Sequence, residues 1–186
     1  MLAPRGFSLI EVLVAMSLSS ILMLGTMRLL PSLQRAVLHE SQLNLMRDDL
    51  WQLAFAIGKQ VQRAGYCHGA CSGQGMEIRD NGHCLVVQWD ANHNGKWEGA
   101  TATEPEQTSY RLRNKSIEIQ RGGTPCSGKG WERLTDPAQF NVETFAVARQ
   151  ARPGRKPLIT ISIAASTAQH PSRRLSVEQR VVGYNL

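Results

Sequence analysis

The chain has 186 residues, 42% of them hydrophobic, and a formal net charge of +6, from 21 lysine and arginine against 15 aspartate and glutamate side chains. This length and composition fit one compact domain with extensions and a globular core. Nothing after Arg28 approaches the length of apolar sequence that crosses a bilayer, which excludes a membrane protein with several spans.

The first 30 residues form the most unusual segment. A leader of residues 1–6, with Arg5 as its only charge, precedes an apolar stretch that has no charged residue from Val12 to Met27. An ordinary secretory signal has its cleavage site after the apolar region, so the order here is inverted. Glu11 lies in the first turn of the apolar stretch, where a carboxylate is costly in a membrane unless something offsets its charge.

The junction between leader and apolar stretch resembles that of type IV prepilins and type II secretion pseudopilins, through Gly6-Phe7-Ser8-Leu9-Ile10-Glu11 and the Val-Leu-Val-Ala-Met that follows. The resemblance implies that prepilin peptidase cuts between Gly6 and Phe7 and methylates the new amine of Phe7. It also implies that Glu11 pairs with the cationic N-terminus of a neighbouring subunit, a buried contact that contributes more to registry than to stability. The alternative is an uncleaved signal anchor in which Glu11 has no role.

One long helix is predicted from Phe7 to about Arg63. Pro31 is tolerable as a kink, and beyond it apolar residues recur at spacings of 3, 4, 3, 4 and 4, the stripe of an amphipathic helix: Leu43, Met46, Leu50, Leu53, Ile57 and Val61. Gly65 is the predicted stop. Such a helix would measure roughly 85 Å, too long for a compact domain. We therefore expect its first half in membrane or filament and its second half packed on a sheet.

After Gly65, short alternating runs separated by turn residues predict antiparallel strands. The turns Asp80-Asn81-Gly82-His83 and Asn114-Lys115 predict two hairpins. The expected strands are Met76–Arg79, Cys84–Trp89, Ser109–Arg113, Ser116–Arg121, Asn141–Gln150, Leu158–Ala164 and Leu175–Gly183, and residues 122–137 form a loop. The predicted fold is α+β, a type IV pilin-like lollipop whose long N-terminal helix packs on an antiparallel, β-rich head.

Four cysteines, Cys67, Cys71, Cys84 and Cys126, lie beyond the apolar stretch. An even number in an exported domain favours disulfides, whereas four cysteines in the cytosol would favour zinc. Only the first two cysteines are close in sequence, which argues against a zinc site. Two disulfides are predicted, with structural zinc or free thiols as alternatives, and the sequence leaves all three pairings open.

A possible calcium loop covers Asp90 to Glu98, which matches the first nine positions of an EF-hand-type loop. The candidate ligands are the side chains of Asp90, Asn92, Asn94 and Glu98 and the carbonyl of Lys96, with Gly95 at the sharp turn. The twelfth position is Thr101, where a bidentate glutamate belongs, and Glu104 or Glu106 could substitute. The alternative is an Asn/Gly-rich turn that binds no metal. His83 and His93 are not placed like metal ligands and are expected on the surface. No cofactor is required by the sequence, and Ca²⁺ is the candidate for this loop.

The excess of basic residues is concentrated at the C-terminal end: from Arg149 onward the sequence has seven basic residues and one acid, Glu178. Such a surface could meet DNA or anionic headgroups. No aromatic residue is interleaved with these charges before Tyr184, so a solvated strand face is favoured and nucleic acid is not an expected partner.

Motifs in the head resemble those of one group of minor pilins. They are Arg63-Ala-Gly-Tyr-Cys67, the pair Cys67 and Cys71, Val87-Gln-Trp-Asp-Ala-Asn92 and Gly130-Trp131. That group is itself similar to the J-type minor pseudopilins and the W-type minor pilins. The resemblance implies a leader (residues 1–6), a transmembrane or filament-core half-helix (7–30) and a periplasmic head (31–186). It implies a single-pass inner-membrane protein that partners prepilin peptidase, other minor pilins and the major pilin.

The implied function is to help initiate type IV pilus assembly and to sit in a complex at the pilus tip. The alternatives are a minor pseudopilin of a type II secretion system, or a tip subunit that binds DNA or a surface. An enzyme is not expected, because the sequence has no nucleophile motif, paired-histidine motif or phosphate loop.

Overall fold

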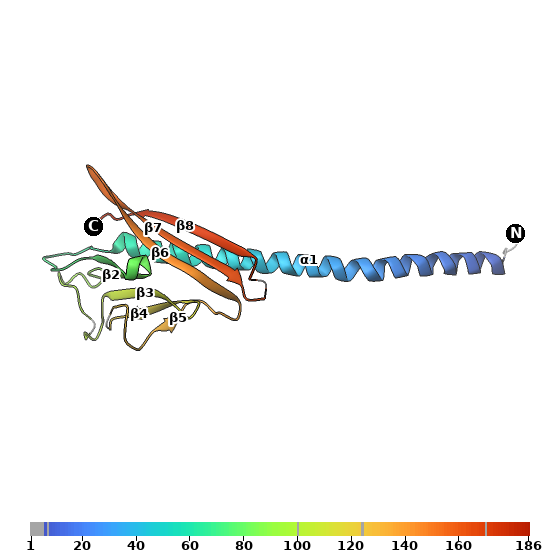
Figure 1. Cartoon of the computed structure of the whole chain (residues 1–186), viewed down its shortest axis with the longest axis horizontal. Helices are drawn as coiled ribbons and strands as arrows, with labels where there is room; N and C mark the ends of the chain where they lie inside the picture. The colour runs from blue at the N-terminus through green and yellow to red at the C-terminus, as the bar shows by residue number, and fades with distance from the viewer. Residues whose placement is uncertain (1–5, 7, 100, 124, 170) are drawn as a thin grey trace, which may run out of the picture. The chain divides into compact units, whose positions relative to one another are not determined.

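The structure, a computed structural model, describes residues 6, 8–99, 101–123, 125–169 and 171–186. Its one long helix, α1 (Leu9–Arg63), precedes two antiparallel sheets (Figure 1). The chain forms two compact units, one ending at Asn44 and the other beginning at Leu45, and α1 contributes to both. The predicted α+β class, with a long N-terminal helix before antiparallel strands, is confirmed.

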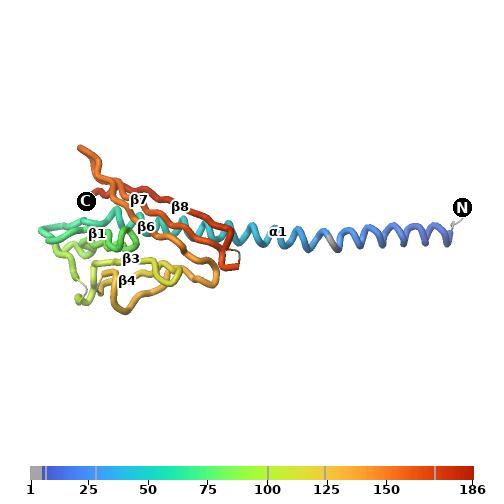
Figure 2. Tube along the Cα trace, viewed as in Figure 1, coloured from blue at the N-terminus to red at the C-terminus, as the bar shows by residue number. Residues whose placement is uncertain are grey.

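The strands form a five-stranded and a three-stranded sheet, which Figures 1 and 2 show as separate groups. The first has the order β1 (Met76–Arg79), β2 (Cys84–Gln88), β3 (Gln107–Arg113), β4 (Ser116–Arg121) and β5 (Glu132–Arg133). The second has the order β6 (Phe140–Arg152), β7 (Arg155–Thr167) and β8 (Arg174–Val182). All seven predicted strands are present, β6 and β7 run further than predicted, and the predicted loop also contains the short β5.

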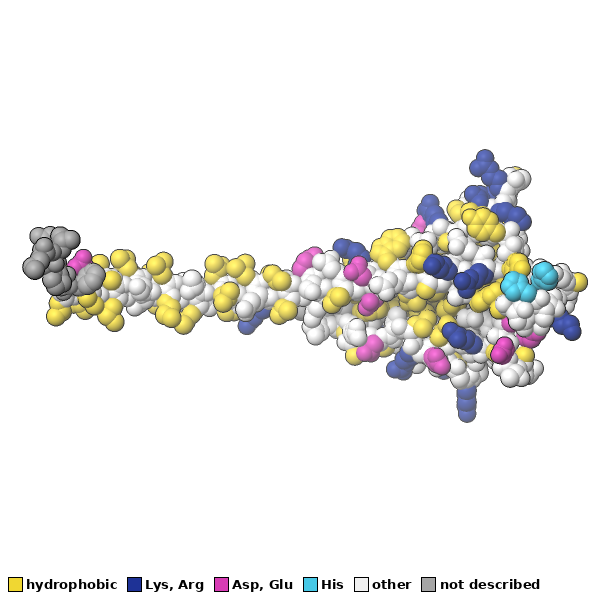
Figure 3. Space-filling model, turned by 180° about the vertical axis from the view of Figure 1, so that it is seen from behind, with side chains coloured by type: hydrophobic (Ala, Val, Ile, Leu, Met, Phe, Trp, Pro, Cys, Tyr) yellow, Lys and Arg dark blue, Asp and Glu magenta, His cyan; other side chains and the backbone are white. Residues whose placement is uncertain are grey.

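The helical first unit is apolar and exposed. Every side chain that the structure describes from Ser8 to Leu38 is exposed, and hydrophobic side chains cover much of the face of this unit seen in Figure 3. Pro31 lies inside the helix without ending it. By length and composition this part of α1 could cross a membrane.

In the second unit, the predicted apolar stripe of α1 is buried except at Leu53, which is half-buried beside the fully buried Ala54. Met46, Leu50, Ile57 and Val61 are at most 3% exposed. The helix approaches β8 closely at Gly58, where an added Cβ would lie 3.1 Å from Cγ1 of Val181. The sequence-predicted face of α1 is therefore the face that forms the core.

Replacing Ile57 by alanine should lower the free energy of unfolding by about 2–5 kcal/mol, because the side chain is fully buried and would leave a cavity. Phe55→Ala is the matched control, since Phe55 lies on the same helix and is 54% exposed. Urea unfolding of the purified chain in detergent, followed by tryptophan fluorescence, measures both. Equal losses for the two variants would contradict this packing.

Gly65 ends α1 with a positive φ of 82°. Its N–H donates to Gln88 O of β2 at 2.9 Å, and a Cβ at this position would lie only 2.5 Å from Asn185 O. Both the left-handed conformation and the close approach favour glycine. The predicted helix stop is confirmed.

The two predicted hairpins are also confirmed. Arg79 pairs with Cys84 across the first turn, whose Asp80 and Asn81 both have positive φ. Asn114 and Lys115, with φ of 51° and 61°, connect β3 to β4 as a two-residue turn, the conformation whose twist suits a tight hairpin.

The second sheet buries one face. Along β7, Pro157, Ile159, Ile161, Ile163 and Ala165 are buried and alternate with less buried residues. A bulge between Val142 and Thr144 shifts the phase of β6, so that Val142 and Phe145 are both buried. The sheets are joined where Val142 N donates to Lys115 O at 2.9 Å.

Candidate assembly segment and acidic loop

Glu11 lies exposed in the first turn of α1. The carbonyl of Ser8 accepts from the N–H groups of Glu11 and Val12, at 3.0 and 3.2 Å. A carboxylate in this position interacts favourably with the positive end of the helix dipole. Within the part of the chain that the structure describes, Glu11 has no ion-pair partner, so its charge is accessible to another molecule.

A shallow hollow beside Glu11 runs along the same helix face. Ala15, Ser19 and Ser20 are among its lining residues. The Ser20 hydroxyl donates within the helix, to Met16 O at 2.7 Å. Small side chains let a second helix approach closely in an apolar environment, and the Ser20 hydroxyl is already satisfied within its own helix.

Gly6 is exposed, and a Cβ added to it would meet no atom within 4 Å. Its φ is not in the left-handed region, so no feature of the fold requires glycine there. Phe7 lies outside the described residues, and cleavage before it and methylation of its amine stay predictions.

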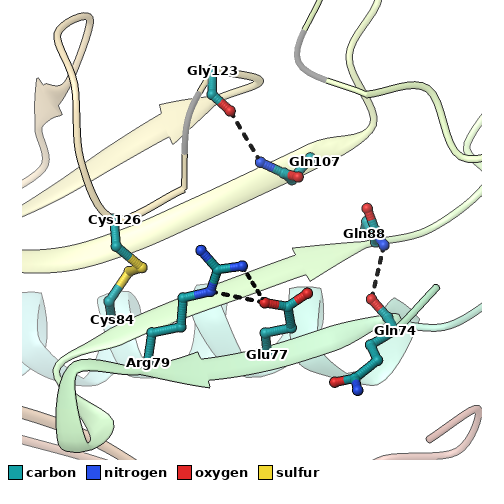
Figure 4. A network of polar contacts seen from close by, with 8 residues as sticks. All are labelled: Gln74, Glu77, Arg79, Cys84, Gln88, Gln107, Gly123 and Cys126. Atoms are coloured by element: carbon teal, nitrogen blue, oxygen red, sulfur yellow. Dashed lines mark hydrogen bonds and ion pairs between the residues drawn. A yellow bond between two sulfur atoms is a disulfide. The ribbon is translucent and has the colours of Figure 1, made fainter.

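All four cysteines form disulfides, as predicted: Cys67–Cys71, and Cys84–Cys126, which is drawn in Figure 4. Asp90 lies near the first pair of sulfurs and Asp80 near the second. Sulfur atoms joined in disulfides are not thiolates and do not bind zinc in the usual way. The first disulfide closes a local loop, whereas the second ties β2 to the loop after β4.

The loop tied by Cys126 covers a buried ion pair that sequence reasoning missed. Arg111 and Glu118 are 9% and 7% exposed and lie 2.9 Å apart, from Nη2 to Oε2. Arg111 Nη1 also donates to Cys126 O at 3.2 Å, and the Trp131 ring lies 3.9 Å from the guanidinium carbon. A usable signal existed, because counting outward from the two-residue turn places Arg111 opposite Glu118.

Further side chain–backbone hydrogen bonds fix the neighbouring segments, as Figure 4 shows. Gln107 Nε2 donates to Gly123 O at 3.4 Å, next to the disulfide loop. Gln88 Nε2 donates to Gln74 O at 2.8 Å, and so holds the segment that leads into β1.

The predicted calcium residues lie in the loop between β2 and β3, with Asp90 at its buried centre. Asp90 is 1% exposed, and its carboxylate accepts from the N–H groups of His68, Asn94 and Gly95 at 2.9–3.0 Å. Burial alone would raise the pKa of Asp90, but the backbone N–H donors outweigh it and hold the pKa below its ordinary value. Asp90 therefore stays ionised at neutral pH.

Glu106, at the end of this loop, is 6% exposed. Its carboxylate accepts from the N–H groups of Ala91, Asn92 and Glu98, at 2.6, 3.2 and 3.2 Å. Glu104 is exposed and makes no such contact. Of the two acids that the sequence left open, Glu106 is the one that folds back onto the loop. Lys96, His83 and His93 are exposed, as expected of the two histidines.

Six of the seven basic residues of the C-terminal end lie on strands of the second sheet, and Arg173 directly precedes β8. Arg149, Arg152, Arg155 and Lys156 belong to the hairpin of β6 and β7. On β8, Arg174 pairs with Glu143 and Arg180 with Glu178. These charges lie along strands, as the prediction of a solvated strand face requires.

The exposed apolar helix with an early acid, followed by a disulfide-bonded antiparallel head, defines a pilin-like subunit. Residues 1–27 match the prokaryotic N-terminal methylation motif. Residues 39–183 match the family described as prepilin peptidase-dependent protein B.

The chain is also 43% identical over 182 residues to prepilin peptidase-dependent protein B of Escherichia coli (strain K12), covering 98% of this chain and 97% of that protein. No solved structure matches the chain. The chain belongs to the prepilin peptidase-dependent protein B family, and the resemblance to minor pilins is confirmed.

Proposed function

We propose that the chain is a minor pilin that helps to initiate type IV pilus assembly and sits in a complex at the pilus tip. Prepilin peptidase cuts between Gly6 and Phe7, residues 7–30 occupy the inner membrane and later the filament core, and residues 31–186 lie in the periplasm. The observation that carries the proposal is the exposed apolar helix in which Glu11 is the only acid before Glu40. The match to the N-terminal methylation motif supports it.

Cleavage and assembly are linked by charge in this proposal. Removal of residues 1–6 leaves a positive amine on Phe7, at the start of an apolar helix. In a helix bundle that excludes water, this amine requires an anionic partner, and Glu11 of a neighbouring subunit supplies one. The small residues of the hollow beside Glu11 allow the neighbouring helix to come close enough.

Glu11→Val should leave cleavage intact and reduce co-isolation with the other pilins by at least about tenfold, which corresponds to only 1.4 kcal/mol. An unpaired buried amine costs more than that. Immunoblots of membranes measure cleavage, and sheared pili and affinity-purified complexes measure incorporation. Glu40→Val is the control, since Glu40 is also exposed on α1. Normal incorporation of the Glu11 variant would contradict the proposal.

The alternative, a minor pseudopilin of a type II secretion system, makes a different prediction for gene deletion. Loss of a pilus initiator abolishes or shortens pili and leaves secretion intact. Loss of a pseudopilin stops secretion of exoproteins and leaves pili intact. Neighbouring genes for minor pilins or for a secretion system separate the two in the same way.

A further inference from the structure

The loop between β2 and β3 is curled around its own side-chain oxygens. Asn94 N donates to both Asp90 Oδ1 and Asn92 Oδ1 at 3.0 Å, and Lys96 N donates to Asn94 Oδ1 at 2.9 Å. His93 and Gly95 have positive φ of 61° and 78°. The side-chain oxygens of the alternate residues 90, 92 and 94 therefore all accept from backbone N–H groups of the loop, as in a calcium-binding turn.

A second observation is independent of this curl. Glu98 Oε2 is buried from solvent and has no hydrogen-bond partner. Its other oxygen, Oε1, contacts the Asn94 amide. A buried carboxylate oxygen without a partner is costly, and in a folded protein it calls for a ligand that satisfies it.

The charge around Glu98 is also uncompensated. The Glu98 N–H donates to Glu106 Oε2 at 3.2 Å, and the carboxyl groups of the two residues lie close together. Asp90 lies in the same loop. Among the described residues, no lysine or arginine forms an ion pair with any of the three acids. Adjacent carboxyl groups without a cationic partner require a bound cation or a shared proton.

We propose that this loop binds one Ca²⁺ ion through Asp90, Asn92, Asn94, Glu98 and Glu106, with the carbonyl of Lys96 as a further ligand. All these donors are oxygens, and the nearest sulfurs are closed in the Cys67–Cys71 disulfide, so a hard cation fits better than zinc. Six or more oxygens in an irregular loop suit Ca²⁺ better than Mg²⁺, which demands an octahedron and keeps its water. Glu106, directly before β3, takes the place of the glutamate that is absent from position twelve.

The ion would stabilise more than the loop itself. Asp90 N and Trp97 Nε1 both donate to Tyr66 O at 2.9 Å. His68 N donates to Asp90 Oδ2. The loop is therefore attached to the segment that follows α1. Bound calcium would stabilise the packing of three neighbouring parts: the end of the helix, the Cys67–Cys71 disulfide and the end of the β2–β3 pair that the loop connects.

The test is calcium titration of the full chain in detergent after removal of divalent ions with a chelator. We expect calorimetric binding with Kd of about 10⁻⁴ to 10⁻³ M, the range of extracellular calcium modules, and a rise in Tm that Mg²⁺ does not reproduce. Tb³⁺ is the second probe, because Trp97 lies in the loop and should sensitise its luminescence, and Ca²⁺ should displace it. No binding at about 10 mM Ca²⁺ and no displaceable Tb³⁺ signal would overturn the proposal.

Glu98→Gln is the informative variant, because it removes the unpartnered charge without changing shape. It should weaken calcium binding at least about tenfold and leave the Tm in chelator unchanged or higher. Glu104→Gln removes an exposed acid from the same loop and should leave affinity unchanged. If the Glu98 and Glu106 carboxyls share a proton instead, neither variant will alter a calcium response. If Glu98→Gln and Glu104→Gln weaken calcium binding to the same extent, the proposed site is also wrong. Neither readout depends on pilus assembly.

Discussion

Replacing Cys84 and Cys126 together by alanine should lower the free energy of unfolding by about 4 kcal/mol. The disulfide spans 42 residues, so its loss restores a large conformational freedom to the unfolded chain. Cys84 is also fully buried in β2, and alanine there fills less of the core. Urea unfolding of the full chain in detergent, followed by tryptophan fluorescence, measures the change.

The Cys67→Ala and Cys71→Ala double variant is the matched control. That disulfide spans only 4 residues, and the same relation gives about 2 kcal/mol. Equal losses for the two pairs would show that loop closure does not govern the effect.

The longer disulfide should also protect the buried ion pair. Its loop supplies Cys126 O and the Trp131 ring to Arg111. When the loop is released, water reaches Arg111 and Glu118, and Trp131 loses a rigid environment. The near-ultraviolet circular dichroism of the native state should therefore weaken more in the Cys84/Cys126 variant than in the Cys67/Cys71 variant.

Local signals made the helix and the hairpins predictable from sequence. The stripe from Met46 to Val61 has the helical period, and burial of one helix face follows from that period whatever lies opposite. Asn114, Asp80 and Asn81 adopt positive φ at less cost than most residues, which favours tight hairpin turns. Gly65 ends the helix for the same local reason.

Features that depend on contacts between residues distant in the sequence were harder to predict. The sequence left three cysteine pairings open because pairing requires knowing that β2 lies beside the loop after β4. The sequence also did not decide whether Glu104 or Glu106 substitutes for the glutamate at the twelfth loop position, because only the folded loop shows which acid turns inward. The predicted β6 ended too early and the predicted β7 began too late. Exposed residues such as Arg149 and Gln150 interrupt the apolar alternation, while the backbone pairing continues to Arg152 and Arg155.

Among the residues predicted to act in assembly, substitution of Gly6 should cause the clearest loss of processing and of pili. Gly6→Leu should block cleavage, so the chain keeps residues 1–6 and Phe7 never gains a free amine. Pili should be absent or much reduced. Mass spectrometry of the N-terminus measures the uncleaved precursor, and electron microscopy counts pili.

The structure makes this test specific, because a side chain at Gly6 meets no atom within 4 Å and no left-handed φ requires glycine there. Misfolding therefore does not explain a loss. Gly25→Ala is the matched control, since an added Cβ is equally unobstructed at Gly25, and processing should stay normal. Gly6→Leu and Glu11→Val should then fail differently, the first as an uncleaved precursor and the second as a cleaved subunit outside the pilus. If Gly6→Leu is cleaved normally, the cut lies elsewhere and the pairing of Glu11 with the Phe7 amine loses its basis.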